Sequence, residues 1–177
     1  QGLIDVMGDT DTAVGVYHLP GLDSVLRSMD AIGESGLSLV PHIVAGLYYG
    51  KLRGERRALE FVSARPPAAL VFVVLTGLPG TPMASVRPPS PLDVARLIAE
   101  ARILMPDVPL SLGCERPRNR DGALLESLAL RAGITRMAVW SEEAVSQARA
   151  WGLVPRFQAT CCSVPFRTDF SCEGPVS

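Results

Sequence analysis

The chain has 177 residues, 47% of them hydrophobic, and a formal net charge of -1. This composition favours a folded domain over disorder, and the small net charge gives no electrostatic reason to expect nucleic acid or a membrane surface as a partner. No apolar run approaches the ~20 residues of a spanning helix and no leader-like segment opens the chain, so we expect a cytoplasmic protein.

Strand-like and helix-like patterns alternate along the chain. Short apolar runs rich in β-branched residues predict strands at residues 3–7, 37–44, 69–75, 108–112 and 136–140. Amphipathic patterns between and after them predict helices at residues 21–35, 55–63, 91–105, 121–132 and 142–151. Five strand–helix units in succession indicate an α/β fold with a parallel sheet.

The spacing of these units favours an incomplete (β/α) TIM-type barrel of about five units, because a full barrel holds roughly 30 residues per unit. The strands are apolar throughout, as expected when helices cover one face and a packed interior covers the other. An open doubly wound sheet is the alternative. It is disfavoured because no strand is followed by a glycine-rich dinucleotide fingerprint.

The chain begins with Gln instead of Met and enters a strand pattern almost at once. We therefore expect the amino-terminal units of the barrel to be missing from this sequence. Residues 1–163 would be its carboxy-terminal part, and residues 164–177 an irregular tail.

The predicted carboxyl ends of the strands carry glycine, proline and polar residues, at the edge where parallel barrels place their chemistry. The segments are DVMGD after the first strand, HIVAGLYYG after the second, TGLPGTPM after the third and GCERPR after the fourth. Glycines there let a ligand approach the backbone, although glycine and proline also simply build turns.

Four stretches together resemble radical S-adenosylmethionine enzymes of the biotin synthase and lipoyl synthase kind. They are VPHIVAGLYYGKLRGERRALEFV, VVLTGLPGTPM, PDVPLSLGCERPR and QATCCS. The closest likeness is to one subunit of the two-protein lipoyl synthase. The resemblance implies an iron–sulfur enzyme that uses a [4Fe-4S] cluster and S-adenosylmethionine to insert sulfur into an unactivated C–H bond of an octanoyl-type substrate.

By this resemblance, six residues are candidates for cofactor binding: Asp5, His42, Gly46, Tyr48, Gly80 and Thr81. Asp5 would accept hydrogen bonds from ribose hydroxyls or the methionyl ammonium group, and Gly46 would admit the nucleoside. Simpler interpretations stay open, since His42 on an apolar strand can be a core residue and Tyr48 can shelter the next turn. Asp9, the other acidic residue of the first loop, has turn or helix-cap chemistry as its alternative.

Cys114 follows the fourth strand, with Arg116 and Arg118 nearby as candidate substrate or anion contacts. Nearby guanidinium groups favour a thiolate. By resemblance, Cys114 with Cys161 or Cys162 would hold an auxiliary iron–sulfur cluster; buried, inert thiols are the alternative. The basic residues that follow Tyr49 invite a phosphate-site interpretation, but a solvated loop and helix face is the favoured one.

The sequence departs from the family at its central motif. The three cysteines of a CxxxCxxC loop hold the family's radical cluster, and the four cysteines here, at positions 114, 161, 162 and 172, do not have that spacing. We therefore expect the chain alone to be inactive. A second radical subunit and a lipoyl-domain or other carrier protein are the expected partners, while a non-catalytic barrel partner and a conventional barrel lyase are the alternatives.

Overall fold

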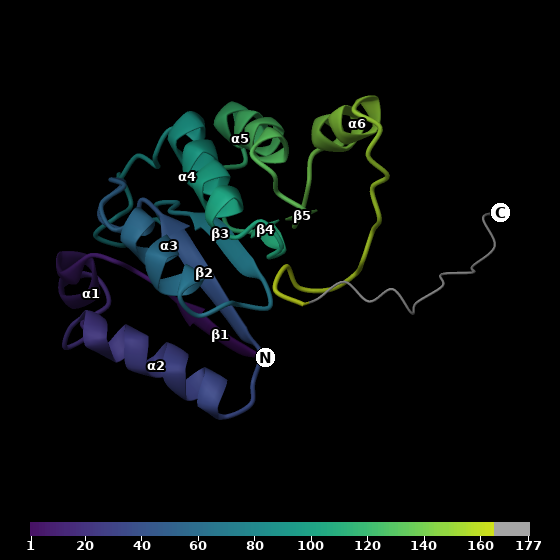
Figure 1. Cartoon of the computed structure of the whole chain (residues 1–177). Helices are drawn as coiled ribbons and strands as arrows, with labels where there is room; N and C mark the ends of the chain where they lie inside the picture. The colour runs from purple at the N-terminus through teal and green to yellow at the C-terminus, as the bar shows by residue number, and fades with distance from the viewer. Residues whose placement is uncertain (165–177) are drawn as a thin grey trace.

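The computed structural model describes residues 1–164, which form one parallel five-stranded sheet (Figure 1). The strands are β1 (Gly2–Asp5), β2 (Leu39–Ala45), β3 (Leu70–Val74), β4 (Leu110–Leu112) and β5 (Arg136–Met137). They lie in sequence order, and every neighbouring pair is parallel. This open sheet with alternating helices confirms the α/β prediction and is consistent with an incomplete (β/α) barrel.

The helices confirm the predicted periodic segments and add one more. They are α1 (Thr10–Gly15), α2 (Leu22–Glu34), α3 (Glu55–Ser63), α4 (Pro91–Leu104), α5 (Arg120–Arg131) and α6 (Glu142–Ala150). The unexpected α1 has only six residues, too few to show an amphipathic period. Asp9 caps it by accepting from the Thr12 backbone N–H at 2.9 Å and the Thr12 hydroxyl at 2.8 Å, which confirms the cap interpretation of Asp9.

The last strand is shorter than the predicted 136–140. Val139 has φ 47°, outside the extended region, and its carbonyl accepts hydrogen bonds from Arg116 and Arg118. The apolar run therefore continues as a loop that the two arginines hold.

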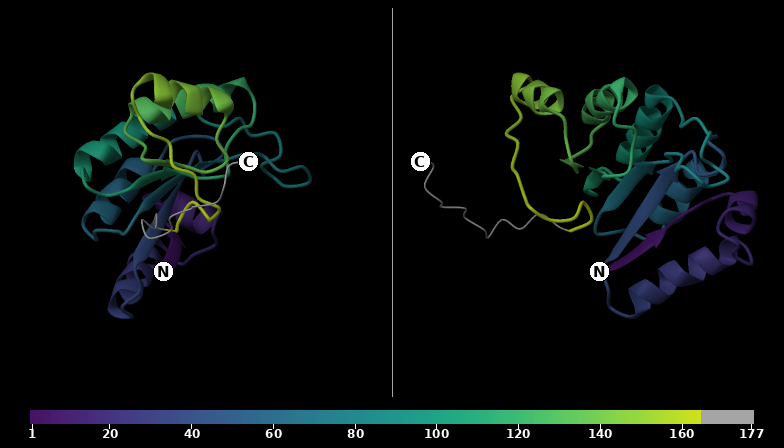
Figure 2. Two further views of the ribbon diagram at one scale, coloured as in Figure 1. Left: turned by 90° about the vertical axis from the view of Figure 1, so that its right-hand side faces the viewer. Right: turned by 180° about the vertical axis from the view of Figure 1, so that it is seen from behind.

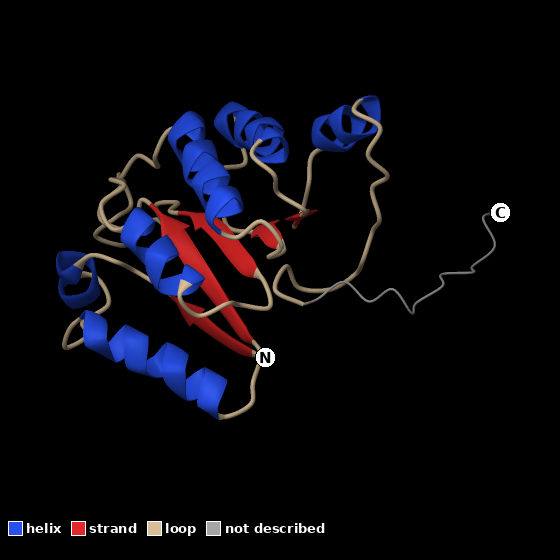
Figure 3. Ribbon diagram, viewed as in Figure 1, coloured by secondary structure: helices blue, strands red, loops and turns tan. Residues whose placement is uncertain are grey.

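The two faces of the sheet have different environments (Figure 3). On one face, alternate strand residues such as Ile43, Phe72 and Leu112 join the main core with side chains from the helices. On the other face, Val40, Ala69 and Val71 form a small cluster that includes no helix residue among residues 1–164.

The chain returns to this second face after α6, as the view from behind shows (Figure 2). The Ser111 hydroxyl donates to the carbonyl of Cys162 at 3.1 Å, and Arg136 Nη1 donates to the carbonyl of Val164 at 3.2 Å. Cys162 also packs against the small cluster on this face. Residues 153–164 are hereafter the return segment, and its last residues, 162–164, lie against the side of the sheet opposite the helices.

No helix within residues 1–164 has the length and apolar character needed to cross a membrane. The predicted tail begins where the description ends, and residues 165–177, including Cys172, lie outside it.

The sheet has two edge strands, β1 and β5, each paired on one side only within the described residues. Unpaired parallel edges and an apolar sheet face favour association with other chains. We predict that the purified chain is oligomeric or poorly soluble in sedimentation experiments. A sharp monomer boundary at low concentration, together with cooperative thermal melting, would contradict this.

Candidate functional site

Strand register places five residues in one row across the second face of the sheet. The row consists of Asp5, His42, Val71, Ser111 and Arg136, each the register partner of the next. Side chains in register on neighbouring parallel strands share a face, so the row begins with an acid and a histidine and ends with a hydroxyl and a guanidinium. This row is the candidate functional site.

Asp5 and His42 are half-buried neighbours at one end of the row. Tyr17 donates its hydroxyl to Asp5 Oδ2, and burial together with this carboxylate raises the pKa of Tyr17 above its usual value. His42 Nδ1 lies 3.3 Å from the carbonyl of Val40. Within residues 1–164, Asp5 Oδ1 and His42 Nε2 have no hydrogen-bond partner, which leaves both atoms for a ligand.

The loop after β2 is organised by a buried carboxylate. Glu55 Oε1 accepts from the Gly46 backbone N–H at 2.8 Å, while Oε2 accepts from the N–H groups of Arg53 and Gly54 at 2.7 and 3.0 Å. Gly46 has φ 80°, and a Cβ there would lie 2.5 Å from the ring of Pro89. Backbone geometry and the proline therefore account for this glycine without a ligand, and a nucleoside contact stays a prediction.

Tyr48 belongs to a contact chain along the rim. The Arg53 guanidinium lies 4.5 Å from the centre of the Tyr48 ring, and Arg53 Nε lies 3.1 Å from Asp9 Oδ1. Arg53 also pairs with Asp11. These contacts tie the loop after β2 to α1, and they match the interpretation of the basic residues as a surface feature.

The loop after β3 is more open. Gly80 and Thr81 are exposed, Gly80 has φ 81°, and the space around its Cα is empty. The Thr81 hydroxyl donates to the carbonyl of Leu78 at 2.8 Å, which closes the turn. The predicted cofactor contacts of both residues therefore lie on an exposed turn and not in the row.

Arg116 and Arg118 have different environments. The Arg116 side chain is fully buried: Nη2 donates to Glu126 Oε1 at 2.6 Å, and other donors reach the carbonyls of Gly113 and Val139. Burial lowers the pKa of Arg116, although Glu126 opposes this change. We therefore assign Arg116 to the structure of the rim. Arg118, the exposed cation of the pair, donates to the carbonyls of Val139 and Cys114.

The three described cysteines line one groove of about 1420 Å³ between β5, α6 and the return segment. The Sγ atoms of Cys161 and Cys162 are 4.0 Å apart, and the Ser163 hydroxyl lies 3.2 Å from Cys161 Sγ. Hydrogen bonds from Ser163 lower the pKa of the Cys161 thiol, whereas burial raises that of Cys162. Within residues 1–164, no three His, Cys, Asp or Glu side chains are arranged to hold a metal ion, so the auxiliary cluster stays a prediction.

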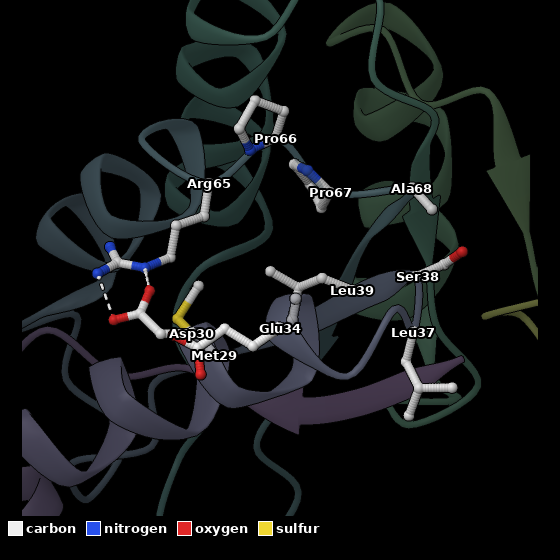
Figure 4. Close-up of a pocket in the computed structure, with 11 residues that line it drawn as sticks. Met29, Asp30, Glu34, Leu37, Ser38, Leu39, Arg65, Pro66, Pro67 and Ala68 are labelled. Atoms are coloured by element: carbon white, nitrogen blue, oxygen red, sulfur yellow. Dashed lines mark hydrogen bonds and ion pairs between the residues drawn. The ribbon is translucent and has the colours of Figure 1, made fainter.

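A second cavity, of about 680 Å³, lies at the opposite end of the strands, between α2 and the loop after α3 (Figure 4). The Asp30–Arg65 ion pair lies at one side of it, with Nε and Oδ1 2.5 Å apart, and the hydrogen bond from Arg65 lowers the pKa of Asp30 (Figure 4). None of the predicted site residues lines this cavity. The amino-terminal end of barrel strands is usually concerned with stability, so we do not place the site there.

Similar proteins bear on this geometry. The chain is 36% identical over 115 residues to the biotin synthase of Synechococcus sp. (strain RCC307), covering 63% of this chain and 33% of that protein. It is 34% identical over 115 residues to the biotin synthase of Alkalilimnicola ehrlichii, and 28% identical over 111 residues to that of Halorhodospira halophila. The chain is similar to biotin synthases.

The chain spans about a third of the length of the curated relatives it matches, with 33%, 33% and 32% of the three covered. No protein-family model matches it. The relatives support the broader part of the resemblance, to proteins of the biotin synthase kind. They do not support the narrower likeness to a lipoyl synthase subunit.

Sequence reasoning missed the residues that organise the site through long-range contacts. Glu55, Glu126, Ser111 and Arg136 lie within ordinary helix or strand patterns. A glutamate on the inward face of a helix was the available signal for Glu126, since Glu is almost never fully buried unless paired. Ser111 and Arg136 could have been found by aligning the strands in register.

We predict that Glu126→Gln lowers the free energy of unfolding by about 3–5 kcal/mol near neutral pH, because it leaves the Arg116 guanidinium buried without a counter-charge. Burial tends to raise the pKa of Glu126, but hydrogen bonds from Ser141 and Arg116 lower it overall. The carboxylate therefore stabilises the fold above its unfolded pKa, and this stabilisation is lost as pH falls through the folded value.

Urea unfolding of wild type and Glu126→Gln from pH 7 to pH 3 measures both effects, and the two proteins should converge in acid. Glu100→Gln is the control, since Glu100 pairs with Arg56 at the surface and should change stability by about 0–1 kcal/mol. Equal losses in the two variants would contradict the buried-pair assignment.

We also predict that Glu55→Gln speeds amide hydrogen exchange at Gly46, Arg53 and Gly54, because a carboxamide offers one acceptor oxygen where the carboxylate offers two. Hydrogen bonds to charged groups are worth about 1.5–3 kcal/mol, so the increase should be about tenfold or more. Glu60→Gln, an exposed change on the same helix, is the control. Unchanged exchange at all three amides would refute the role of Glu55.

Proposed function

We propose that this chain forms part of a radical S-adenosylmethionine enzyme that inserts sulfur into an unactivated C–H bond. The observation that carries the proposal is its similarity to biotin synthases over 115 residues. The parallel sheet supports it, because strand register gathers polar groups on one face as a substrate-binding barrel requires.

The end of the row formed by Asp5 and His42 fits a polar, positively charged cofactor. Tyr17 fixes the Asp5 carboxylate through Oδ2, which leaves Oδ1 to accept from an ammonium or a ribose hydroxyl. His42 Nε2 can donate or accept beside it. When bound, S-adenosylmethionine and a reduced [4Fe-4S] cluster would supply radical abstraction of hydrogen from carbon.

The chain's own contribution is to orient the cofactor and to exclude water from the site. Val40, Val71 and Val73 lie on the face that carries Asp5 and His42, and an apolar surface beside the polar end keeps solvent from a reactive species. We extend the proposal to the nucleoside of the cofactor. It would be contacted by residues of the loops around the row, namely Gly46, Tyr48, Gly80 and Thr81.

The radical cluster needs ligands from outside these 177 residues, because the cysteines at positions 114, 161, 162 and 172 do not provide a CxxxCxxC loop. We propose that a longer chain or a second radical subunit supplies that loop. Since the described thiols do not form a ready metal site, we derive no step through an auxiliary cluster.

For the substrate, we propose an octanoyl or lipoyl-type chain on a carrier domain, as the sequence motifs suggest; a biotin precursor is the alternative that the relatives' name favours. A non-catalytic partner subunit is the second candidate function, since these 177 residues contain no CxxxCxxC loop. A conventional lyase that uses a Schiff base lacks support, because no strand from β1 to β5 contains lysine.

The first test is to sequence the source DNA upstream of the Gln1 codon. The proposal predicts a continuous frame that encodes CxxxCxxC, or a neighbouring gene that does. The encoded protein, reconstituted anaerobically with iron and sulfide, should then release 5'-deoxyadenosine, and His42→Ala should lower that release by about tenfold or more, in line with the loss of one polar contact at a desolvated site.

Two results would count against the proposal. One is the absence of a CxxxCxxC loop from both the upstream reading frame and the neighbouring genes. The other is a reconstituted protein that makes no 5'-deoxyadenosine. Octanoyl-carrier and biotin-precursor substrates, assayed side by side, separate the two substrate alternatives. If the chain forms a stable complex with another subunit but has no activity of its own, the non-catalytic partner function is favoured.

A further inference from the structure

The groove beside β5 contains a cation that the proposed chemistry does not use. Its charged lining residues are Arg102, Asp107, Arg136 and Arg156. Most of the remaining lining is apolar. Such a surface attracts anions, and low-dielectric walls strengthen the attraction.

Arg136 is the member of this set with donors to spare. It is half-buried, and within residues 1–164 its hydrogen-bond partner is the neutral carbonyl of Val164, with no carboxylate within ion-pair distance. A guanidinium has five N–H donors, and this contact uses one. Burial lowers the pKa of Arg136.

The other buried arginines differ on this point. Arg116 has Glu126 as a counter-charge. Arg102 donates to the carbonyls of Met105, Pro106, Val108 and Gly133, so its guanidinium is fully engaged in joining two loops. Burying a charge without a counter-charge is unfavourable, so the half-buried guanidinium of Arg136 is suited to bind an anion.

The same groove has an apolar wall. Trp140 and Phe157 contact each other with ring centres 4.9 Å apart, and both remain about half exposed, at 42% and 53%. Leu153 and Val154, at 51% and 83% exposure, extend this wall along the return segment. Large exposed apolar side chains gathered around a cavity mark a binding surface.

We propose that this groove binds a small carboxylate with an apolar body, the carboxylate on Arg136 and the body against Trp140 and Phe157. The site is separate from the proposed cofactor end of the row. Arg136 lies three strands from His42, about 14 Å at the usual spacing of strands. The inference therefore holds whether or not the chain belongs to a radical enzyme.

Binding can be followed with the protein's own fluorescence. The chain has two tryptophans, and Trp151, which stacks on Arg131, does not line the groove. In the Trp151→Phe background, Trp140 is the only reporter. Decanoate, titrated below its aggregation concentration, should change this emission saturably, whereas acetate and decanol should bind at least tenfold more weakly.

Variants of Arg136 test whether this residue binds the carboxylate. Arg136→Met should weaken decanoate binding by tenfold or more, and Arg136→Lys should keep part of it. Arg149→Met, an exposed arginine on α6 outside the groove, is the matched control and should bind as the parent does. Circular dichroism of each variant shows whether the fold is intact.

Three results would overturn the proposal. The first is no saturable response to decanoate. The second is decanol binding as well as decanoate, which would make the groove an apolar face for another polypeptide. The third is an equal loss in Ser111→Ala, which frees the carbonyl of Cys162, because Arg136 would then act only by holding the return segment.

Discussion

The register of the parallel sheet is the constraint on which the site depends. Side chains alternate between faces, and one face is fixed by burial of residues such as Ile43 and Phe72 against the helices. A slip of one residue would move His42 into that core and expose Ile43, so burial of the helix-covered face also fixes what the opposite face presents. The apolar core therefore determines the position of the polar row without contacting a ligand.

Two buried carboxylates extend this order to the rim. Glu55 holds three backbone amides of the loop after β2, and Glu126 joins Arg116 to the backbone N–H of Ser141. In each case the carboxylate can be buried because both of its oxygens accept hydrogen bonds. These bonds fix the positions of the groups that donate them. The loops after β2 and β4 are thus preorganised by buried carboxylates, whereas the exposed turn around Gly80 is closed by the bond from Thr81 to the carbonyl of Leu78.

Local patterns predicted most of the fold because strands and helices repeat with clear periods. Helix 55–63 was correct at both ends, while α1 was missed because six residues show no period. The presence of Asp5 and His42 at the same edge of the sheet followed from the rule that parallel strand ends share an edge, whereas their pairing in register did not. The role of Arg116 did not follow, since its partner Glu126 is on the next helix and burial is a property of the assembled structure. The path of the return segment also had no local signal, because hydrogen bonds from distant strands fix it.

The return segment links the thiols to the row. It brings Cys161 and Cys162 to the second face, and hydrogen bonds from Ser111 and Arg136 to its backbone hold it there. For these thiols and Cys114 to converge on one metal ion, the segment would have to move, because no three-residue metal site exists within residues 1–164 as they stand. An anion on Arg136 would use donors that the carbonyl of Val164 leaves free, so both backbone hydrogen bonds can persist when the groove is occupied.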